Sequence, residues 1–260
     1  MVEWNAEQYL RFGNERTQPS RDLAAQLPPD DGTVERVLDI GCGPGNSTAV
    51  LRARYPHAEI LGVDSSPEMI AAARQTHTDM GFALCDVSDP AQLAGLGEGY
   101  DVVFSNACIQ WVPDHPRLIP ALLGLLRKGG TLAVQTPMNY REPIHRIVAE
   151  LVHSPGYADR LPQQREFFNL TPADYWELLR AHAASFRMWT TTYMHTLPSH
   201  GAIMDWYRGT GLRPYLQALA DGERAAFEAE VFARVREAYP VQSDGSVIFP
   251  FPRLFFTAVR

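Results

Sequence analysis

Val37-Leu38-Asp39-Ile40-Gly41-Cys42-Gly43-Pro44-Gly45-Asn46 decides the fold, because an apolar strand runs directly into a glycine-rich turn. Glycine lets the backbone turn tightly at a strand end and lets a ligand approach without a Cβ in the way. We expect the strand over residues 34–40, and a helix to about Tyr55 that Asn46 or Ser47 caps. The pattern therefore predicts a ligand-binding loop at the carboxyl end of a strand.

The spacing of the glycines separates this loop from the dinucleotide-binding loop, which has the pattern G-x-G-x-x-G and holds a pyrophosphate at a helix N-terminus. Here the pattern is G-x-G-x-G, Asn46 follows it, and the carboxylate of Asp39 would lie beside a pyrophosphate. A nicotinamide dehydrogenase is therefore disfavoured. A binding protein without catalysis stays as the alternative from another functional class.

The segments that follow the loop alternate between strand and helix as far as Pro137. Strands are expected at residues 59–63, 82–85, 100–105 and 131–135, and helices at 65–75 and 114–126. This alternation is typical of βαβ units with right-handed crossovers and a parallel sheet. Beyond Pro137, helices are expected at 142–153, from 171, at 202–208 and at 221–239, with strands at 186–197 and 247–259.

The composition limits the class of partner. The chain has 260 residues and a formal net charge of -7, and 22 of its 23 basic residues are arginine, with Lys128 the single lysine. Binding to nucleic acid needs many phosphate-neutralising cations, so a nucleic-acid partner is not expected. No apolar run approaches the length that spans a bilayer, and no secretory signal is visible. Three cysteines without metal-ligand spacing predict no metal site and a reduced, cytoplasmic protein.

The glycine loop and the residues after the next strands resemble the class I S-adenosylmethionine-dependent methyltransferases. Asp64 ends the second strand, Asp86 follows the third, Asn106 follows the fourth, and residues 126–132 match the turn before the fifth. Taken singly, Asp64 also suits a cap acceptor and Asp86 a turn residue. The resemblance implies S-adenosylmethionine as cofactor, bound by Arg16, Gly41, Cys42, Gly43, Asn46, Asp64, Ser65, Met69, Asp86, Val87 and Asn106.

The same resemblance implies a single α/β methyltransferase domain over residues 1–260. Its fold would be Rossmann-like, with a mostly parallel, doubly wound sheet and a helical cap formed by late insertions. We expect the cofactor-binding core at about residues 30–137, the cap insertions within about 138–245, and the final strand at 246–260.

A narrower resemblance, to the trans-aconitate methyltransferases within this class, runs along the whole chain. It is carried by the segments Trp4–Pro19, Asn106–His115, Arg141–His145, Trp189–His200, Thr210–Pro214 and Phe251–Phe255. It implies methyl transfer to a carboxylate of trans-aconitate, which gives the monomethyl ester and S-adenosylhomocysteine. The alternative is a methyltransferase for a different small acid or natural product. Because a carboxylate is already ionised at pH 7, we expect alignment rather than a catalytic acid or base.

A tricarboxylate substrate is best neutralised by arginine, whose planar fork binds carboxylates through two hydrogen bonds. The expected substrate-binding residues are Tyr9, Trp111, Tyr140, Arg141, His145, His195, Arg213 and Arg253. Arg16 suits the carboxylate of the cofactor equally well, and Arg208 suits an exposed, solvated position on a helix. Structural roles in packing stay open for each aromatic residue and each histidine.

Overall fold

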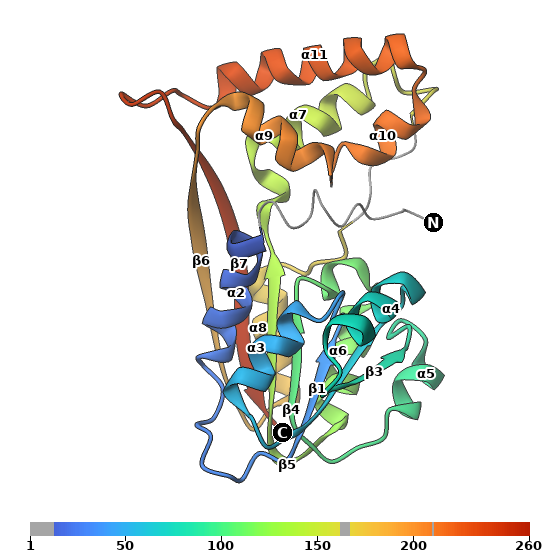
Figure 1. The fold of residues 1–260 in the computed structure, drawn as a ribbon, viewed down its shortest axis with the longest axis vertical. Coiled ribbons are helices and arrows are strands. Elements are labelled where there is room, and N and C mark those ends of the chain that lie inside the picture. Colours follow the sequence, from blue (N-terminus) through green and yellow to red (C-terminus); the bar gives the residue numbers. More distant parts are fainter. Residues whose placement is uncertain (1–12, 162–166, 210) are drawn as a thin grey trace. The chain divides into compact units, whose positions relative to one another are not determined.

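The computed structural model describes residues 13–161, 167–209 and 211–260, without the side chains of residues 13–16. Within them, seven strands form one sheet in the order β3-β2-β1-β4-β5-β7-β6 (Figure 1). The strands are β1 Arg36–Ile40, β2 Glu59–Asp64, β3 Gly81–Leu84, β4 Tyr100–Asn106, β5 Leu126–Pro137, β6 Ser185–Leu197 and β7 Val247–Val259. The expected strands are all present, and β5 is longer than predicted.

The first five strands pair in parallel, and β7 pairs antiparallel with β5, from Thr131 opposite Val259 to Pro137 opposite Arg253. The prediction of a mostly parallel, doubly wound sheet is therefore confirmed. The strand order reverses between β1 and β4, which have their sequence neighbours on opposite sides. In open α/β sheets, ligands bind outside the carboxyl ends of the strands at such a reversal.

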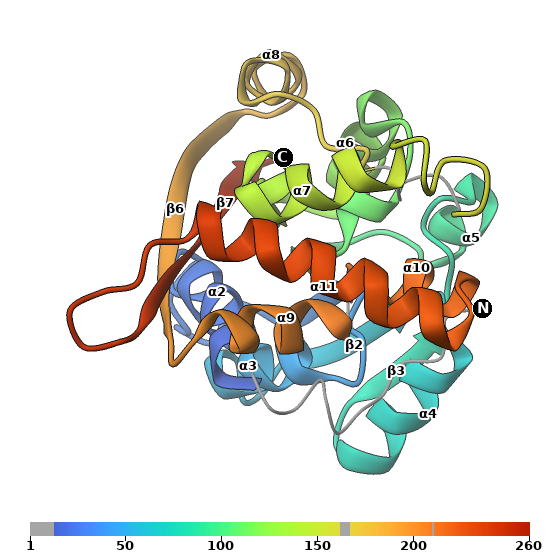
Figure 2. The same cartoon turned by 90° about the horizontal axis from the view of Figure 1, so that it is seen from above.

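The described part of the chain also contains ten α-helices. They are α2 Gly13–Ala24, α3 Asn46–Arg54, α4 Pro67–Thr76, α5 Pro90–Gly95, α6 His115–Gly124, α7 Pro143–Val152, α8 Pro172–His182, α9 His200–Arg208, α10 Arg213–Ala218 and α11 Asp221–Ala238. Short 3₁₀ turns follow β4 and β5 at Ile109–Trp111 and Asn139–Arg141. In Figure 2, α3 and α4 lie on one face of the sheet and α6 and α8 on the other.

The chain divides into two compact units. The sheet unit comprises Arg16–Pro137, Phe167–Thr191 and Arg253–Arg260, and its central strands β1 and β4 are almost entirely buried. The helical unit, as far as it is described, comprises mainly residues 138–161, 192–209 and 211–252. Its core is aromatic, because Trp206, Tyr207, Phe227 and Phe249 are each at most 5% exposed.

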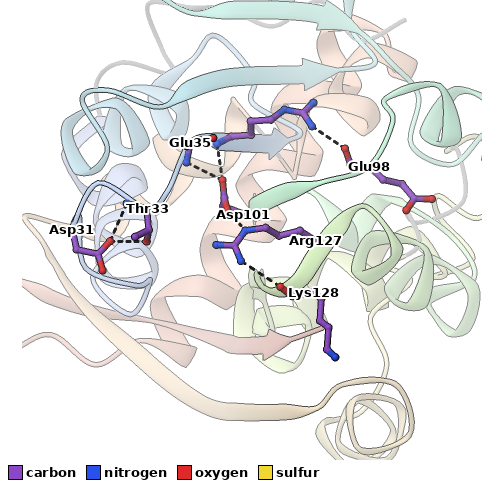
Figure 3. A network of polar contacts seen from close by, with 8 residues as sticks. Asp31, Thr33, Glu35, Glu98, Asp101, Arg127 and Lys128 are labelled. Atoms are coloured by element: carbon purple, nitrogen blue, oxygen red, sulfur yellow. Dashed lines mark hydrogen bonds and ion pairs between the residues drawn. The ribbon is translucent and has the colours of Figure 1, made fainter.

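At the amino ends of β1 and β4, the buried carboxylate of Asp101 joins three segments (Figure 3). Its Oδ2 accepts the backbone N–H groups of Glu35 and Arg36, each at 2.8 Å, and its Oδ1 accepts the Arg127 Nε–H. Burial raises the pKa of Asp101, but the bonds from Arg127, Arg36 and Glu35 outweigh burial and leave that pKa below its ordinary value. The network fixes the strand ends opposite to those that carry the glycine loop.

Two short helices, α2 and α5, were not expected from the sequence. Asp89 caps α5 by accepting the backbone N–H of Ala91 at 2.9 Å, and Pro90 stands at its first position. Ser66 and Thr171 cap α4 and α8, since the side chain of each accepts a backbone N–H group there. Among the described helices, none combines the length and the apolarity that crossing a membrane requires.

Candidate functional site

Polar side chains gather on one face of the sheet where β1, β2, β4 and β5 end. In the strand register, Asp39 lies opposite Phe104, two residues before Asn106, and Asn106 lies opposite Gln135. In the pairing of β1 with β2, Asp39 lies opposite Gly62, two residues before Asp64. Because side chains alternate along a strand, Asp39, Asp64, Asn106 and Gln135 share this face.

The glycine loop combines two tightly packed glycines with an open one. Gly41, Gly43 and Gly45 all have positive φ values, at 71°, 55° and 94°. A Cβ on Gly41 would lie 2.2 Å from the Cys108 Sγ, and a Cβ on Gly45 would lie 2.4 Å from a ring carbon of His77. A Cβ on Gly43 would meet no atom of the described residues within 4 Å. Gly43 is therefore the point at which a ligand can approach the backbone.

Asp64 links the glycine loop to the start of α4. Its Oδ2 accepts the backbone N–H of Gly43 at 3.0 Å, and its Oδ1 accepts the backbone N–H of Ser66 at 2.9 Å. The residue is partly exposed, and each carboxylate oxygen has a second lone pair. Asp64 can therefore accept two further hydrogen bonds from a diol beside the loop.

Asp39, two residues before Gly41, is fully buried and serves the packing of α3. Its Oδ2 accepts the hydroxyls of Ser47 at 2.6 Å and Thr48 at 2.7 Å. Burial raises the pKa of Asp39 to about 6, against the lowering effect of these two hydroxyls. The expectation that Asn46 or Ser47 caps α3 is wrong, because the chain enters the helix through Gly45 and the Ser47 hydroxyl is committed to Asp39.

The residues assigned to the adenine side follow β2 and β3. Met69 is partly buried in the first turn of α4, where Ser66 accepts its backbone N–H at 3.2 Å. Asp86 is exposed, and its Oδ1 accepts the backbone N–H of Ser88 at 2.9 Å and its hydroxyl at 2.6 Å. Val87 is buried. The Oδ2 of Asp86 therefore stays available to an amino group.

The other predicted cofactor residues differ in how far their side chains are exposed. Cys42 is 3% exposed and packs with Phe82, so its backbone rather than its thiol is presented to a ligand. Asn46 is partly buried and Ser65 is exposed. Arg16 belongs to α2, but its side chain lies outside the described residues.

Five of the predicted substrate residues belong to the helical unit. The exposed Arg141 has its guanidinium 5.8 Å from the centroid of the Tyr140 ring. His145 packs edge-on against Tyr207 at 5.3 Å, and burial lowers the pKa of His145 to about 4. His195 stacks with Tyr193, at a ring distance of 6.2 Å. Arg213, which is partly buried, is the first residue of α10.

The sheet unit holds the remaining described candidates. Trp111 stacks on Phe167 at 4.9 Å. Arg253 is only 7% exposed, and its Nη1 donates to the Oε1 of Gln135 at 3.1 Å. Tyr9 lies outside the described residues.

Arg208 takes the exposed helical position that the sequence suggested, whereas Gln135 is a residue that the sequence did not indicate. Arg208, on α9, is paired with Asp205 at 2.7 Å and with Glu228 at 2.5 Å, so its charge is compensated at the surface. Gln135 was not singled out, although it is fully buried beside Asn106. The available signal was a polar amide at the carboxyl end of an otherwise apolar strand.

Comparison with known proteins assigns the family. The profile of the methyltransferase domain matches residues 9–218. A protein named trans-aconitate 2-methyltransferase, from an Azoarcus species, is 48% identical over the full length of both chains.

Solved structures share the fold. The YcgJ protein of Bacillus subtilis superposes with a TM-score of 0.59 at 14% identity, over 94% of this chain and 98% of that one. A phosphoethanolamine N-methyltransferase of Haemonchus contortus, solved with S-adenosylhomocysteine, has a TM-score of 0.57 at 17% identity, over 94% of this chain and 53% of that one. With the full-length relative, these findings establish that the chain belongs to the trans-aconitate 2-methyltransferase family of class I methyltransferases.

Proposed function

We propose that this protein transfers the methyl group of S-adenosylmethionine to a carboxylate of trans-aconitate. The products are the monomethyl ester and S-adenosylhomocysteine. The observation that carries the proposal is Asp64, which accepts one backbone N–H on each carboxylate oxygen beside the glycine loop and keeps a lone pair on each. Such a carboxylate suits the two ribose hydroxyls of the cofactor.

The other residues of the sheet unit fit the same cofactor. The open side of Gly43 gives a ligand access to the loop backbone. Within the described part of the chain, the Oδ1 of Asn106 at the end of β4 is buried without a hydrogen-bond partner, and an acceptor there suits the positively charged part of the cofactor. Asp86 offers a free carboxylate oxygen for an exocyclic amino group. We assign cofactor binding to this part of the chain, within about residues 30–137.

Methyl transfer to a carboxylate does not require an acid or a base from the protein. S-adenosylmethionine, when bound, supplies a methyl group already activated by its sulfonium. The acceptor carboxylate is ionised at pH 7, so no base is needed to expose its lone pair. One carbon–oxygen bond forms as one sulfur–carbon bond breaks, and the sulfur leaves as a neutral thioether. The residues of this chain therefore bind the two reactants, align them and exclude water.

The acceptor is an anion with several carboxylates, and arginine is the side chain best suited to hold it. We propose Arg253 as the substrate-binding residue of the sheet unit, because its buried guanidinium lies on the face that carries Asp64 and Asn106. Arg141, Arg213, His145, His195, Tyr140, Trp111 and Tyr9 stay predictions for the same role. We propose the cytoplasm as the site of action and a small polycarboxylate, with no nucleic acid, as the reaction partner.

The test is a transfer assay with methyl-labelled cofactor and a panel of di- and tricarboxylic acids. We expect trans-aconitate to gain one methyl group by mass, with saturation, and Asp64→Ala to weaken S-adenosylhomocysteine binding about 100-fold in calorimetry. Asp79→Ala is the matched control, because Asp79 is an exposed carboxylate in a surface pair with Arg52. Binding of S-adenosylhomocysteine should also raise the melting temperature.

Two results would contradict this proposal. Turnover of another acid or of a natural product, with none of trans-aconitate, would leave the methyltransferase in place and replace its substrate. A melting temperature raised by NAD and not by S-adenosylhomocysteine would replace the cofactor.

A further inference from the structure

Three neighbouring strands of the sheet unit carry polar side chains close together: Asn106 ends β4, Gln135 lies near the end of β5, and Arg253 lies within β7. Asn106 lies opposite Gln135, and Gln135 lies opposite Phe255, two residues along β7 from Arg253. Since side chains two residues apart on a strand share a face, these three lie side by side on one face of the sheet. Gln135 and Arg253 are 0% and 7% exposed.

The hydrogen bond from Arg253 fixes the orientation of the Gln135 amide. The Arg253 Nη1 donates to the Gln135 Oε1 at 3.1 Å. A guanidinium has donors and no acceptor, so the oxygen and not the nitrogen of the amide must face it. The Nε2 of Gln135 is then directed away from Arg253, and it is buried without a hydrogen-bond partner among the residues that the structure describes.

A buried donor without a hydrogen-bond partner lowers the stability of the fold unless a bound ligand accepts its hydrogen bond. Asn106 lies opposite Gln135 in the strand register, and its Oδ1 is a buried acceptor without a hydrogen-bond partner among the described residues. Ala107, which follows Asn106 in the chain, has a φ of 54° and donates its backbone N–H to the backbone carbonyl oxygen of Gln135 at 3.0 Å. A left-handed alanine costs of order 1–2 kcal/mol, and such strain gathers at functional sites.

The polarity changes in a definite order across these strands. The glycine loop follows β1, and moving away from it the sheet presents an acceptor on β4, then a donor on β5, then a cation on β7. An acceptor beside the loop suits the positive part of the cofactor. A donor and a cation, one and two strands further on, suit a carboxylate.

We propose that Gln135 and Arg253 together receive one carboxylate of the acceptor substrate. The Gln135 amide donates to that carboxylate through Nε2 and holds the Arg253 guanidinium in place through Oε1. The assignment rests on the proposed function for the identity of the acid. It makes Gln135 a substrate-binding residue rather than a structural amide of the sheet.

Gln135→Glu separates the two tasks of this side chain. Glutamate has nearly the shape of glutamine and keeps an oxygen for Arg253, but it loses the donor and carries a charge that repels a carboxylate. We expect the KM for trans-aconitate to rise about 30-fold or more, as follows from the loss of a hydrogen bond to a charged group. The dissociation constant of S-adenosylhomocysteine should stay within about twofold, and the variant should remain folded.

Gln26→Glu is the matched control. The Oε1 of Gln26 accepts from the Nη1 of Arg187 at 3.3 Å on the exposed surface of the same unit. The chemical change is identical, and we expect no effect on the KM for trans-aconitate. Gln135→Met, which removes both tasks, should raise that KM as well.

Two measurements test the inference. Calorimetry gives the affinity of trans-aconitate for the protein saturated with S-adenosylhomocysteine, and steady-state kinetics give the KM for trans-aconitate. An unchanged KM in Gln135→Glu overturns the inference, and so does weaker binding of S-adenosylhomocysteine with unchanged affinity for trans-aconitate. If the wild type binds trans-aconitate through Gln135 but does not methylate it, the proposed function fails and the inference stands. If it methylates trans-aconitate equally well in Gln135→Glu, the inference fails and the function stands.

Discussion

The sheet unit and the helical unit hold their polar groups in different ways. In the sheet unit, carboxylates are paired with backbone N–H groups at short range, as with Asp64 beside the glycine loop and Asp101 at the opposite strand ends. In the helical unit, polar groups such as the Tyr207 hydroxyl and the His145 ring are buried against aromatic side chains. The first unit is specified by hydrogen bonds and backbone turns, and the second mainly by burial of apolar surface.

The largest expected effect tests the backbone turns of the sheet unit. Gly41→Ala should lower the free energy of unfolding by about 4 kcal/mol, because it adds left-handed strain to a Cβ placed 2.2 Å from the Cys108 Sγ. Urea unfolding of the variant and the wild type measures this change in the free energy of unfolding. Gly97→Ala is the control, since Gly97 has a similar φ of 76° with nothing within 4 Å, and it should cost only about 1 kcal/mol. Equal costs in the two variants would remove the packing argument.

The next effect tests burial in the helical unit through pH. Burial lowers the pKa of His145 from its usual 6.5 to about 4, so the unfolded chain binds a proton more readily than the folded one between these values. The stability that depends on neutral His145 is therefore complete above pH 6.5 and is lost as the pH falls towards 4. The full loss is about 3 kcal/mol, of which about 2 kcal/mol falls between pH 7 and 5.

His145→Phe should flatten that pH dependence in urea unfolding, since phenylalanine does not titrate. His57→Phe replaces an exposed histidine and should leave the dependence as it is in the wild type. A wild type and a His145→Phe variant with parallel pH curves would contradict the desolvation of this ring.

A smaller effect tests the polar network at the amino ends of the strands. Asp101→Asn keeps an oxygen for the N–H groups of Glu35 and Arg36 but turns an amide donor towards Arg127, and should cost about 2 kcal/mol. The KM for trans-aconitate should not change, because this network lies at the strand ends away from the glycine loop. Asp79→Asn, at an exposed surface pair, should cost almost nothing. A changed KM in Asp101→Asn would contradict the conclusion that the amino ends of the strands act independently of the ends that carry the glycine loop.

The smallest effect compares two tyrosines of the helical unit. The Tyr239 hydroxyl accepts the Ile144 N–H at 3.2 Å, whereas the buried Tyr207 hydroxyl has no hydrogen-bond partner. Tyr239→Phe should cost about 1 kcal/mol, and Tyr207→Phe should be neutral or gain up to about 0.5 kcal/mol. Thermal unfolding of the two variants side by side gives the answer. A clear loss in Tyr207→Phe would show that its hydroxyl is satisfied by a bound water.

What the sequence predicted depends on how local each feature is. The strand that ends at Ile40 and the loop after it were predicted correctly, because hydrophobic pattern and glycine spacing are properties of neighbouring residues. The cap of α3 was predicted wrongly, because a local rule cannot tell that the Ser47 hydroxyl would bond to Asp39 instead of the helix end. α5 was missed because six residues are too few to show a helical period.

The sequence shows Gln135 only as a polar amide in an apolar strand, and its role could not be predicted for a physical reason. Its meaning depends on Arg253, which is 118 residues away and is brought beside it by the antiparallel pairing of β5 with β7. Asn106, opposite Gln135, was predicted as a cofactor residue because it follows a strand within a local motif. That the Asn106 Oδ1 and the Gln135 Nε2 are buried without hydrogen-bond partners among the described residues follows only from the folded structure.

The contact between Gly41 and Cys108 also makes the glycine loop observable by thiol chemistry. Burial raises the pKa of Cys108 to about 12 and raises that of Cys42 further, so both sulfurs are protonated and poorly nucleophilic in the folded protein. Since Cys42 is buried, a thiol reagent reacts with it mainly when the loop has opened, and the rate of labelling at Cys42 reports the population of that open state. The protein thus carries its own chemical probe of the loop, which needs no introduced label and which a bound ligand should slow.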